Sequence, residues 1–412
     1  MMLSFTPNTS SARSPAHSST HSRRNAMLGS ALLALAVLVL PILISASGSM
    51  TWLRIADIAL LYIMLALGLN IVVGFAGLLD LGYIAFFAVG AYVWALLSSP
   101  HLAQAFPALG PDGLHWPMWV ILPLGACIAG LFGVLLGAPT LRLRGDYLAI
   151  VTLGFGEIVR IFMNNLNQPI NLTNGPQGIT RIDPVMFGQF SFGKSVTFGS
   201  ITVPSLMLYY YLFAALAVLI VVASIRLQDS RIGRAWEAIR EDEIAARAIG
   251  INTRNIKLLA FAMGASFGGV AGGLFASLQG FISPESFGLM DSICVLCMVV
   301  LGGMGHIPGV ILGTLLLTGL PEALRHWAGP AQQALLGKVV IDPEALRMLL
   351  FGVALVLVMQ FRPAGLWPSS TRQRELEALT DTLPDDGNDN DEDDANDDND
   401  DEASQRSKEV RS

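Results

Sequence analysis

Three polar side chains within apolar stretches of this 412-residue chain are the first candidates for chemistry. Asp80 and Glu157 are carboxylic acids, and Asn70 is an uncharged amide shortly before Asp80. A charge at the centre of a bilayer costs roughly 2.5–3.5 kcal/mol, so such a group faces protein or water rather than lipid. We therefore expect these side chains to line or brace a polar path through a membrane. The candidate pathway residues are Asn70, Gly74, Gly77, Asp80, Thr152 and Glu157.

A structural role is the alternative for these residues. Gly74, Gly77 and Gly154 are positions where a helix can break, and polar side chains nearby would satisfy the backbone groups that a break leaves open. Glu157 has Arg160 three residues further on, which is the spacing of an ion pair on one helix face. Both interpretations of Asn70 and Asp80 remain open from the sequence.

Catalytic and metal chemistry find no support in the residue pattern. Cys294 and Cys297 form a C-x-x-C pair, but they lie in an apolar stretch without a basic neighbour to activate a thiol, which favours packing. The six histidines lack the spacing of a metal site. The pattern Gly-x-x-x-x-Gly-Lys-Ser occurs once, at Gly188–Ser195, but it lies in the segment 164–204, which has few basic residues and is expected to be an external loop, so it does not indicate an ATP site. We expect no enzyme activity, no metal and no cofactor bound by this chain, so any ATP-driven work falls to a partner.

The segment Ser230–Lys257 is the strongest local feature. The stretch Arg234–Ile249 contains good helix formers with apolar residues near helical spacing, and Gly250 provides a stop. Charges of both signs crowd this predicted helix, whereas a helix that rests on lipid would carry a basic face. We therefore expect it to dock in a groove on a partner protein. The candidate docking residues are Arg234, Glu237, Arg240, Glu243, Ala245, Ala246 and Gly250.

The composition indicates the elements that must position these residues. Hydrophobic residues make up 53% of the chain and charged residues 14%, where soluble domains carry about 25% charged residues. The net charge of −7 is misleading, because 13 of the 32 acidic residues lie between Asp381 and Glu402. A soluble enzyme and a disulfide scaffold are both excluded, and an all-α polytopic membrane protein is expected.

The predicted fold has about ten membrane crossings, some broken or re-entrant, with a coupling helix on the cytoplasmic side. Ala26–Ala46 has the length of a first crossing, although a basic pair before it also matches a secretory signal. Basic residues mark the loops that should face the cytoplasm, which places both termini there. The crossings are Ala26–Ala46, Trp52–Val73, Phe75–Ser98, Trp116–Gly137, Tyr147–Met163, Ser205–Ile225, Leu258–Ile282, two halves of Ser292–Leu320, and Leu346–Phe361.

The domain organisation follows from this pattern. Residues 1–25 and 369–412 lack the apolar content to fold and are expected to be solvated tails, the second strongly acidic. Residues 26–368 form the transmembrane domain, with the coupling loop at about 227–257. Gly264, Gly268 and Gly272 recur every four residues, a stripe that is typical of close helix packing.

Several blocks of sequence together resemble the LivM-type permeases of the branched-chain amino acid ABC transporter family. Ala245–Gly250 matches the Ala-Ala-x-x-x-Gly part of the coupling-loop pattern of ABC importers, with Ile244 in the usual acidic position and Glu243 one residue earlier. The resemblance spans about residues 52–368. The other blocks are Ala66–Asn70, Gly74–Gly82, Arg144–Tyr147, Thr152–Gly154, Leu172–Gly178, Arg231–Gly250, Gly302–Gly305 and Arg362–Leu366.

The resemblance implies a permease subunit of an ATP-driven importer in a bacterial inner membrane. Its substrates would be leucine, isoleucine and valine. Its partners would be two cytoplasmic ATPase subunits, a second homologous permease and a periplasmic substrate-binding protein, with the lipid bilayer around it and no nucleic acid. Urea or a short-chain amide is the alternative substrate class, and an ion-driven secondary transporter using Asp80 and Glu157 is a further alternative. A secondary transporter would not need a docking helix.

Overall fold

The structure is a computed structural model of the chain, and it describes part of the residues between 38 and 367. These are residues 38–45, 50–106, 113–141, 143, 145–187, 190–198 and 201–336, with 349, 352, 353, 356, 360, 366 and 367. The chain divides into two units, Met1–Pro368 and Ser369–Ser412, and everything described here belongs to the first. The predicted tails 1–25 and 369–412, and most of the first and last predicted crossings, lie outside the described residues.

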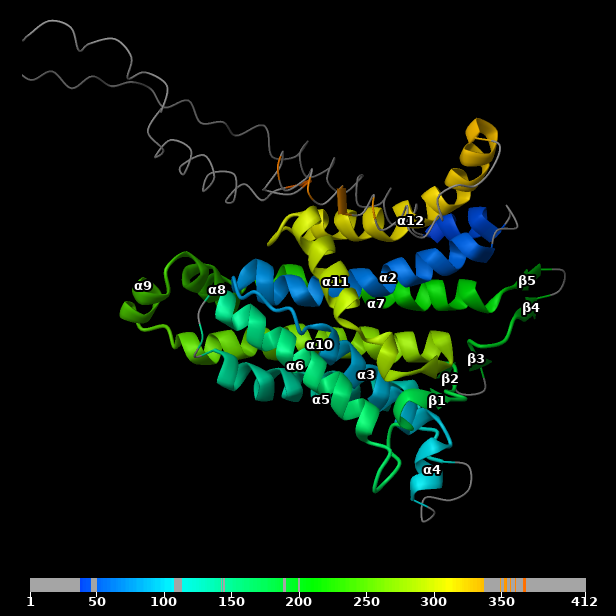
Figure 1. Cartoon of the computed structure of the whole chain (residues 1–412), viewed down its shortest axis with the longest axis horizontal. Coiled ribbons are helices and arrows are strands. Elements are labelled where there is room, and N and C mark those ends of the chain that lie inside the picture. Colours follow the sequence, from blue (N-terminus) through cyan, green and yellow to red (C-terminus); the bar gives the residue numbers. More distant parts are fainter. Residues whose placement is uncertain are drawn as a thin grey trace, which may run out of the picture. The chain divides into compact units, whose positions relative to one another are not determined.

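Helices make up most of this part of the chain (Figure 1). Residues 38–45 are helical and are followed by a long series of apolar helices. The helices are α2 (Met50–Asn70) with its π-turn η1 (Ile71–Phe75), α3 (Ile84–Ser98), α4 (His101–Ala105), α5 (Met118–Thr140), α6 (Asp146–Asn165), η3 (Gly175–Gln177), α7 (Ser205–Gln228), α8 (Arg231–Glu241), α9 (Glu243–Ala248), α10 (Thr253–Gln279), η4 (Pro284–Ser286), α11 (Leu289–Gly302) and α12 (Ile307–Leu336).

Three short antiparallel strand pairs lie at the end of the helices opposite α8 and α9 (Figure 1). Strand β1 (Ile179–Thr180) pairs with β6 (Phe281–Ile282), which connects the segment before α7 to the end of α10. The other two pairs are hairpins, β2 (Met186–Phe187) with β3 (Phe190–Ser191), and β4 (Val196–Phe198) with β5 (Ile201–Val203).

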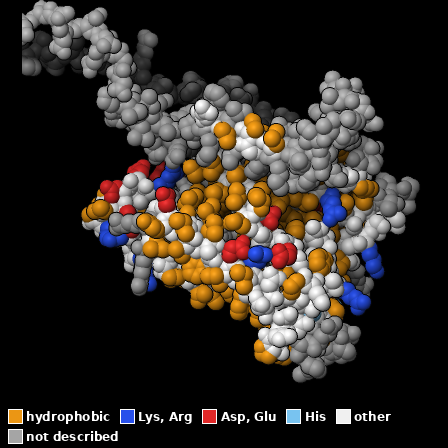
Figure 2. Space-filling view, in the orientation of Figure 1, with side chains coloured by type: hydrophobic (Ala, Val, Ile, Leu, Met, Phe, Trp, Pro, Cys, Tyr) orange, Lys and Arg blue, Asp and Glu red, His pale blue; other side chains and the backbone are white. Residues whose placement is uncertain are grey.

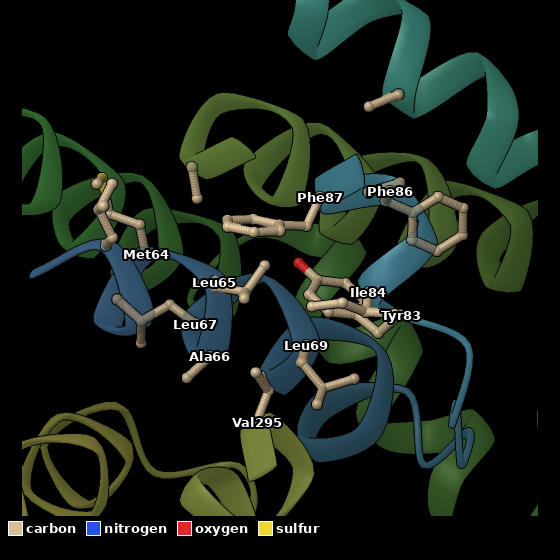
Figure 3. Close-up of a cluster of buried hydrophobic side chains, with 14 of the residues drawn as sticks. Met64, Leu65, Ala66, Leu67, Leu69, Tyr83, Ile84, Phe86, Phe87 and Val295 are labelled. Carbon is tan, nitrogen blue, oxygen red and sulfur yellow. The ribbon is translucent and has the colours of Figure 1, made fainter. Parts of the chain in front are cut away.

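The core forms around α2, which contacts α7, α10, α11 and α12, while α3 contacts α5 and α10. Figure 3 shows Leu65 and Leu69 of α2 facing the start of α3, where Tyr83, Phe86 and Phe87 lie. All five of these side chains are buried. The break before α3 is therefore enclosed by well-packed apolar side chains.

The predicted glycine stripe lies where α10 approaches α2 and α3. A methyl group on Gly264 would stand 2.8 Å from the Gly68 carbonyl oxygen of α2, and one on Gly268 would stand 3.2 Å from the Tyr83 hydroxyl. On Gly272 it would overlap the carbonyl oxygen of Phe87 in α3. Only glycine allows the backbones to come this close, as a packing role requires.

The described residues include 5 helices that are long and apolar enough to cross a membrane. They are Met50–Phe75, Met118–Thr140, Ser205–Gln228, Thr253–Gln279 and Pro284–Gly302, and the shorter apolar helices Ile84–Ser98 and Ile307–Ala323 accompany them. Figure 2 shows hydrophobic side chains over much of the middle of the visible face, with charged ones at the α8–α9 end, in a small acidic and basic group near the centre, and at the opposite side. The all-α polytopic fold class is confirmed, and the count of ten crossings stays a prediction.

The breaks predicted near Gly77 and after Gly302 are confirmed, whereas the break predicted near Gly154 is wrong, because α6 continues through it, and one boundary is also wrong. The stretch Ser292–Leu320 divides into α11 and α12, as its glycine-rich middle predicted. The predicted crossing Phe75–Ser98 instead becomes regular helix only at Ile84. The reason is local, because Gly77 adopts a φ of +67°, which residues with a side chain rarely adopt. Residues 76–83 form an irregular segment, called the limb below.

Candidate functional site

The limb (residues 76–83) lies between α2 and α3 and is mostly buried. Its first turn is held by backbone hydrogen bonds, from Ala76 N–H to the Ile71 carbonyl at 3.1 Å and from Leu78 N–H to the Val72 carbonyl at 3.0 Å. Beyond that point its polar backbone groups need other partners. Irregular backbone at membrane depth is tolerated only where it is buried in protein or lines a water-filled cavity. The limb is thus the natural place for a polar site.

Two predicted pathway residues, Asp80 and Thr152, come together on the limb. The Leu81 N–H donates to Thr152 Oγ1 at 3.0 Å, and the Thr152 hydroxyl donates to the Ala149 carbonyl at 3.1 Å. One carboxylate oxygen of Asp80 accepts from the Gly82 N–H at 2.9 Å, whereas Oδ2 is buried without a hydrogen-bond partner. Both side chains therefore accept hydrogen bonds from the irregular backbone, whereas Asp80 Oδ2 takes no part in this support.

A small cavity opens beside these residues. Its enclosed space measures about 10 Å³, which is room for about one water-sized group. Its walls come from the limb and from α3, α5, α6 and α10, and they are mainly aromatic and aliphatic. The lining residues are Asp80, Gly82, Phe86, Leu136, Thr140, Thr152, Phe155 and Phe261.

Asn70, Gly74 and Gly77 form a second group at the start of the limb. Asn70 Oδ1 accepts from the backbone N–H of Gly305, in the loop between α11 and α12, at 2.8 Å. A methyl group on Gly74 would overlap Asn70 Oδ1 and stand 2.5 Å from the Gly305 nitrogen. The Asn70 amide therefore connects the break after α2 with the break between α11 and α12. This is the structural role that the sequence left open as an alternative.

Glu157 lies apart from both groups, in an ion-pair network. Its Oε2 stands 2.9 Å from Arg160 Nε, and Arg160 Nη1 stands 2.9 Å from an oxygen of Glu285 in η4. Asn164 donates to the other Glu285 oxygen at 3.2 Å. The alternative pairing of Glu157 with Arg160 is thus present, and its place on a translocation pathway stays a prediction.

The coupling segment consists of two helices, whereas a single helix over Arg234–Ile249 was predicted. α8 begins after Ser230, whose hydroxyl accepts from Ile232 N–H and Gly233 N–H, and it ends at Glu241. Asp242 is extended, and its carboxylate caps α9 by accepting from Ile244 N–H at 2.7 Å and Ala245 N–H at 3.1 Å. An aspartate at this position favours the start of a new helix over continuation of the old one.

The break decides which side chains of the segment face outward. Trp236 is fully buried and its Nε1–H donates to the Ile256 carbonyl at 2.7 Å, while Ala246 is also buried. Ile244 is 73% exposed and Ile249 is 76% exposed. Of the predicted docking residues, those that are exposed are Arg234, Glu237, Ala245 and Gly250.

Arg240, Glu243 and Ala246 of the predicted docking set face this chain instead. Glu243 forms ion pairs with Arg247 and Lys257, each at 2.8 Å. Arg240 Nη1 donates to the Gly74 carbonyl oxygen at 2.7 Å. A methyl group on Gly77 would stand 2.8 Å from Arg240 Cγ, so the arginine stem lies directly on the limb. Arg240 thus connects α8 with the limb that carries Asp80.

Sequence reasoning missed one buried acid and several other residues. Asp57 of α2 is 0% exposed, and within the described part of the chain neither carboxylate oxygen has a hydrogen-bond partner. The sequence pattern that singled out Asp80 also applies to Asp57, because both are carboxyl groups within apolar stretches. Trp236 and Ile244 carried no comparable signal. No group of three or more possible metal ligands occurs within the described part of the chain.

Comparison with known proteins shows the family to which the chain belongs. The family model described as the branched-chain amino acid transport system permease component matches residues 51–359. The chain is 44% identical to the high-affinity branched-chain amino acid transport system permease protein LivM of Escherichia coli (strain K12), over 78% of this chain and 71% of that protein.

Two further relatives are more distant. LivH of the same organism is 30% identical over 64% of this chain and 81% of its own length. BraD of Pseudomonas aeruginosa, another high-affinity branched-chain amino acid transport system permease protein, is 28% identical over 74% of this chain and 91% of its own. No solved structure matches the chain. With its apolar helices and broken segments, the chain belongs to the family of branched-chain amino acid transport system permease components, as a LivM-type member and a multi-pass membrane protein.

Proposed function

We propose that this chain is the permease subunit of an ATP-driven importer that moves leucine, isoleucine and valine across a bacterial inner membrane. The names of its relatives support the substrate class. The observation that carries the proposal is the coupling segment, which exposes Ile244 and Ile249 outside the apolar helices. Two large aliphatic side chains exposed among charges of both signs fit a protein partner better than a lipid surface.

Partner subunits supply the energy and deliver the substrate. Two cytoplasmic ATPases would dock on the α8–α9 pair of this chain and on its counterpart in a second, homologous permease. A periplasmic binding protein would deliver the amino acid at the opposite end. Both termini then lie in the cytoplasm. This chain performs no bond chemistry and binds no cofactor, because ATP is hydrolysed by its partners.

Motion would reach the site through Arg240. Dimerisation of the ATPases would rock α8, and the contact of Arg240 with Gly74 and Gly77 would carry that displacement to the limb. Because the limb is not a continuous helix, it can shift without breaking a ladder of backbone hydrogen bonds. The permease then switches access when its two conformations bind the ATPases with different affinity.

Two matched glycine variants test the docking surface. Gly250 and Gly280 both adopt positive φ, +93° and +65°, and at neither would a methyl group meet another atom within 4 Å. Gly250→Asp and Gly280→Asp therefore introduce similar backbone strain, at the α8–α9 end and at the end of α10. We expect Gly250→Asp to weaken ATPase retention by about tenfold or more, since a charge would enter the interface core, while Gly280→Asp retains the ATPases.

Retention is measured by co-purification, and function by uptake of radiolabelled leucine and urea into vesicles that contain the complex. Leucine uptake that needs ATP and the ATPases supports the proposal. Uptake that continues without any ATPase would favour ion-driven transport, and uptake of urea without leucine would overturn the substrate. Equal retention by the two glycine variants would remove α9 from the interface.

A further inference from the structure

The Asp80 carboxylate is buried among the helices, beside the last residue of α5, Thr140, and the early turns of α6. The limb that carries it ends at Tyr83, whose hydroxyl donates to the Gly264 carbonyl oxygen at 2.7 Å. Gly264 lies well inside α10 (Thr253–Gln279), so the limb reaches far from either end of that helix. Figure 3 shows the apolar side chains that surround Tyr83 at this depth. Asp80 is itself only 2% exposed.

The hydrogen bonds within the chain satisfy one half of this carboxylate. Oδ1 accepts from the Gly82 N–H at 2.9 Å, and this bond alone would be served equally well by an asparagine. Oδ2 is buried and forms no hydrogen bond with any of the residues that the structure describes. A buried carboxylate oxygen without a partner is costly, and burial of a charge is tolerated when a cation pairs with it. The structural role of Asp80 thus accounts for the oxygen that accepts from Gly82. It does not account for the second oxygen or for the negative charge.

The cavity beside Asp80 indicates what kind of cation would fit. Phe86, Phe155 and Phe261 form much of its wall, and Leu136 adds an aliphatic surface. Aromatic faces attract ammonium groups, and aromatic and aliphatic walls accept a hydrocarbon chain. With an enclosed space of about 10 Å³, the cavity admits a group about the size of a water molecule rather than a whole ligand. A primary ammonium group has this size and the positive charge.

We infer that Asp80 Oδ2 is the counter-ion for the α-ammonium group of the transported amino acid, which enters the cavity with its ammonium end only. This inference rests on the proposed function. It excludes urea and amides as good ligands of this site, because they carry no positive charge to offset the cost of the buried carboxylate. Substrate recognition is then a property of this chain as well as of its external binding protein.

Asp80→Asn and Asp57→Asn form the test pair, because both remove a buried carboxylate and only one of the two lines the cavity. Binding of radiolabelled leucine to the purified complex of permeases and ATPases, without the external binding protein, is measured at equilibrium. We expect Asp80→Asn to bind leucine at least about tenfold more weakly than wild type, and Asp57→Asn to stay within about twofold of it.

Competition by leucine analogues identifies which chemical group of leucine Asp80 binds. Isoamylamine keeps the ammonium and the hydrocarbon of leucine, and 4-methylpentanoate keeps the carboxylate and the hydrocarbon. In wild type, isoamylamine should compete with leucine and 4-methylpentanoate should not, and Asp80→Asn should abolish competition by the amine. Competition by urea, or amine competition that is equal in wild type and Asp80→Asn, would overturn the inference.

Two controls distinguish a lost ammonium contact from misfolding. One is the Asp80→Glu variant, and the other is retention of the ATPases by each variant. Asp80→Glu keeps the charge and should recover part of the leucine binding, whereas a purely structural requirement for the Gly82 hydrogen bond predicts that Asp80→Asn behaves as wild type. Unchanged leucine binding and uptake in Asp80→Asn would therefore refute the counter-ion role. If the wild-type complex shows no ATP-driven leucine uptake, the proposed function itself is wrong, which is a distinct result.

Discussion

Asp57 and Asp80 are both buried carboxyl groups in apolar surroundings, but the backbones that carry them differ. Asp57 lies inside the regular helix α2, on a turn that packs with Tyr210 and Ala214 of α7. Neither of its oxygens has a hydrogen-bond partner. Asp80 lies on the limb, where it accepts a backbone hydrogen bond and lines a cavity.

This difference shows that burial of a charge does not by itself indicate a site. A regular helix satisfies its own backbone, so the Asp57 carboxyl has no open backbone group of α2 to support. The limb has backbone groups without helical partners, and Arg240 links it to α8. We therefore expect a displacement of the limb to move both Asp80 and the coupling segment. A break in the helix, rather than the acid alone, distinguishes the functional candidate.

The largest effect is expected where the limb touches α6. A methyl group on Gly82 would overlap the Thr152 carbonyl oxygen, while one on Gly154 of the same helix would meet nothing within 4 Å. Gly82→Ala should push the limb away at a cost of about 1–3 kcal/mol and strongly reduce leucine uptake. Gly154→Ala should be neutral or stabilising by up to about 1 kcal/mol. Thermal unfolding and uptake of both variants measure this, and equal behaviour would mean that the close approach is unimportant.

The next effect is expected at the link between the limb and the coupling segment. Arg240 donates to Gly74, whereas the exposed Arg234 on the same helix donates only to the nearby Asp229 carbonyl, at 2.9 Å. Arg240→Met should lower uptake about tenfold while the ATPases stay bound and hydrolyse ATP, which corresponds to about 1.4 kcal/mol of lost coupling.

Arg234→Met is the control for that experiment, since it removes the same charge from the same helix. It should leave the ratio of leucine transported to ATP hydrolysed unchanged. Arg240→Lys should recover only part of that ratio, because an ammonium on a different stem does not reproduce the guanidinium geometry. If Arg234→Met uncouples hydrolysis from uptake as much as Arg240→Met does, the limb is not driven through Arg240.

Sequence patterns predicted the backbone breaks and the position of the coupling segment well. Gly77 and the glycines from 302 to 309 mark places where a helix cannot continue cheaply, and the structure is broken at both. The glycine stripe likewise lies at a close approach between helices. These signals are local, because glycine and its conformational freedom can be recognised without knowing the tertiary contacts.

The directions of side chains in the coupling segment were not predictable in the same way. A single helix was expected, but the cap at Asp242 starts a second helix whose faces are rotated relative to the first. Ile249, which had the spacing of a buried residue, is therefore exposed, and Glu243 turns toward Lys257. The long stem of Arg240 reaches the limb from a helix that appeared to serve a partner, and such a contact depends on tertiary structure alone.

A smaller effect is expected at the hydroxyl that supports the limb. Thr152→Val keeps the shape of the side chain but leaves the Leu81 N–H without the partner that it has at 3.0 Å. We expect a loss of about 1–3 kcal/mol in stability and a moderate decrease in uptake, because a buried donor is left unsatisfied. Thr152→Ser restores the hydroxyl and should recover most of both. Valine and serine variants that behave alike would show that the limb does not depend on this hydrogen bond.

The smallest effect on transport is expected at Asp57. Asp57→Leu replaces a fully buried carboxyl without partners by a hydrocarbon in an apolar contact between α2 and α7. Replacing a buried charge by a packed apolar residue is often neutral or stabilising by about 1–4 kcal/mol, so the unfolding temperature of the purified complex should stay constant or rise. Leucine uptake should stay at the wild-type level. A large loss of uptake in a well-folded Asp57→Leu complex would show that a carboxyl in a regular helix serves transport too, and the distinction between the two acids would then have to rest on something other than the break in the backbone.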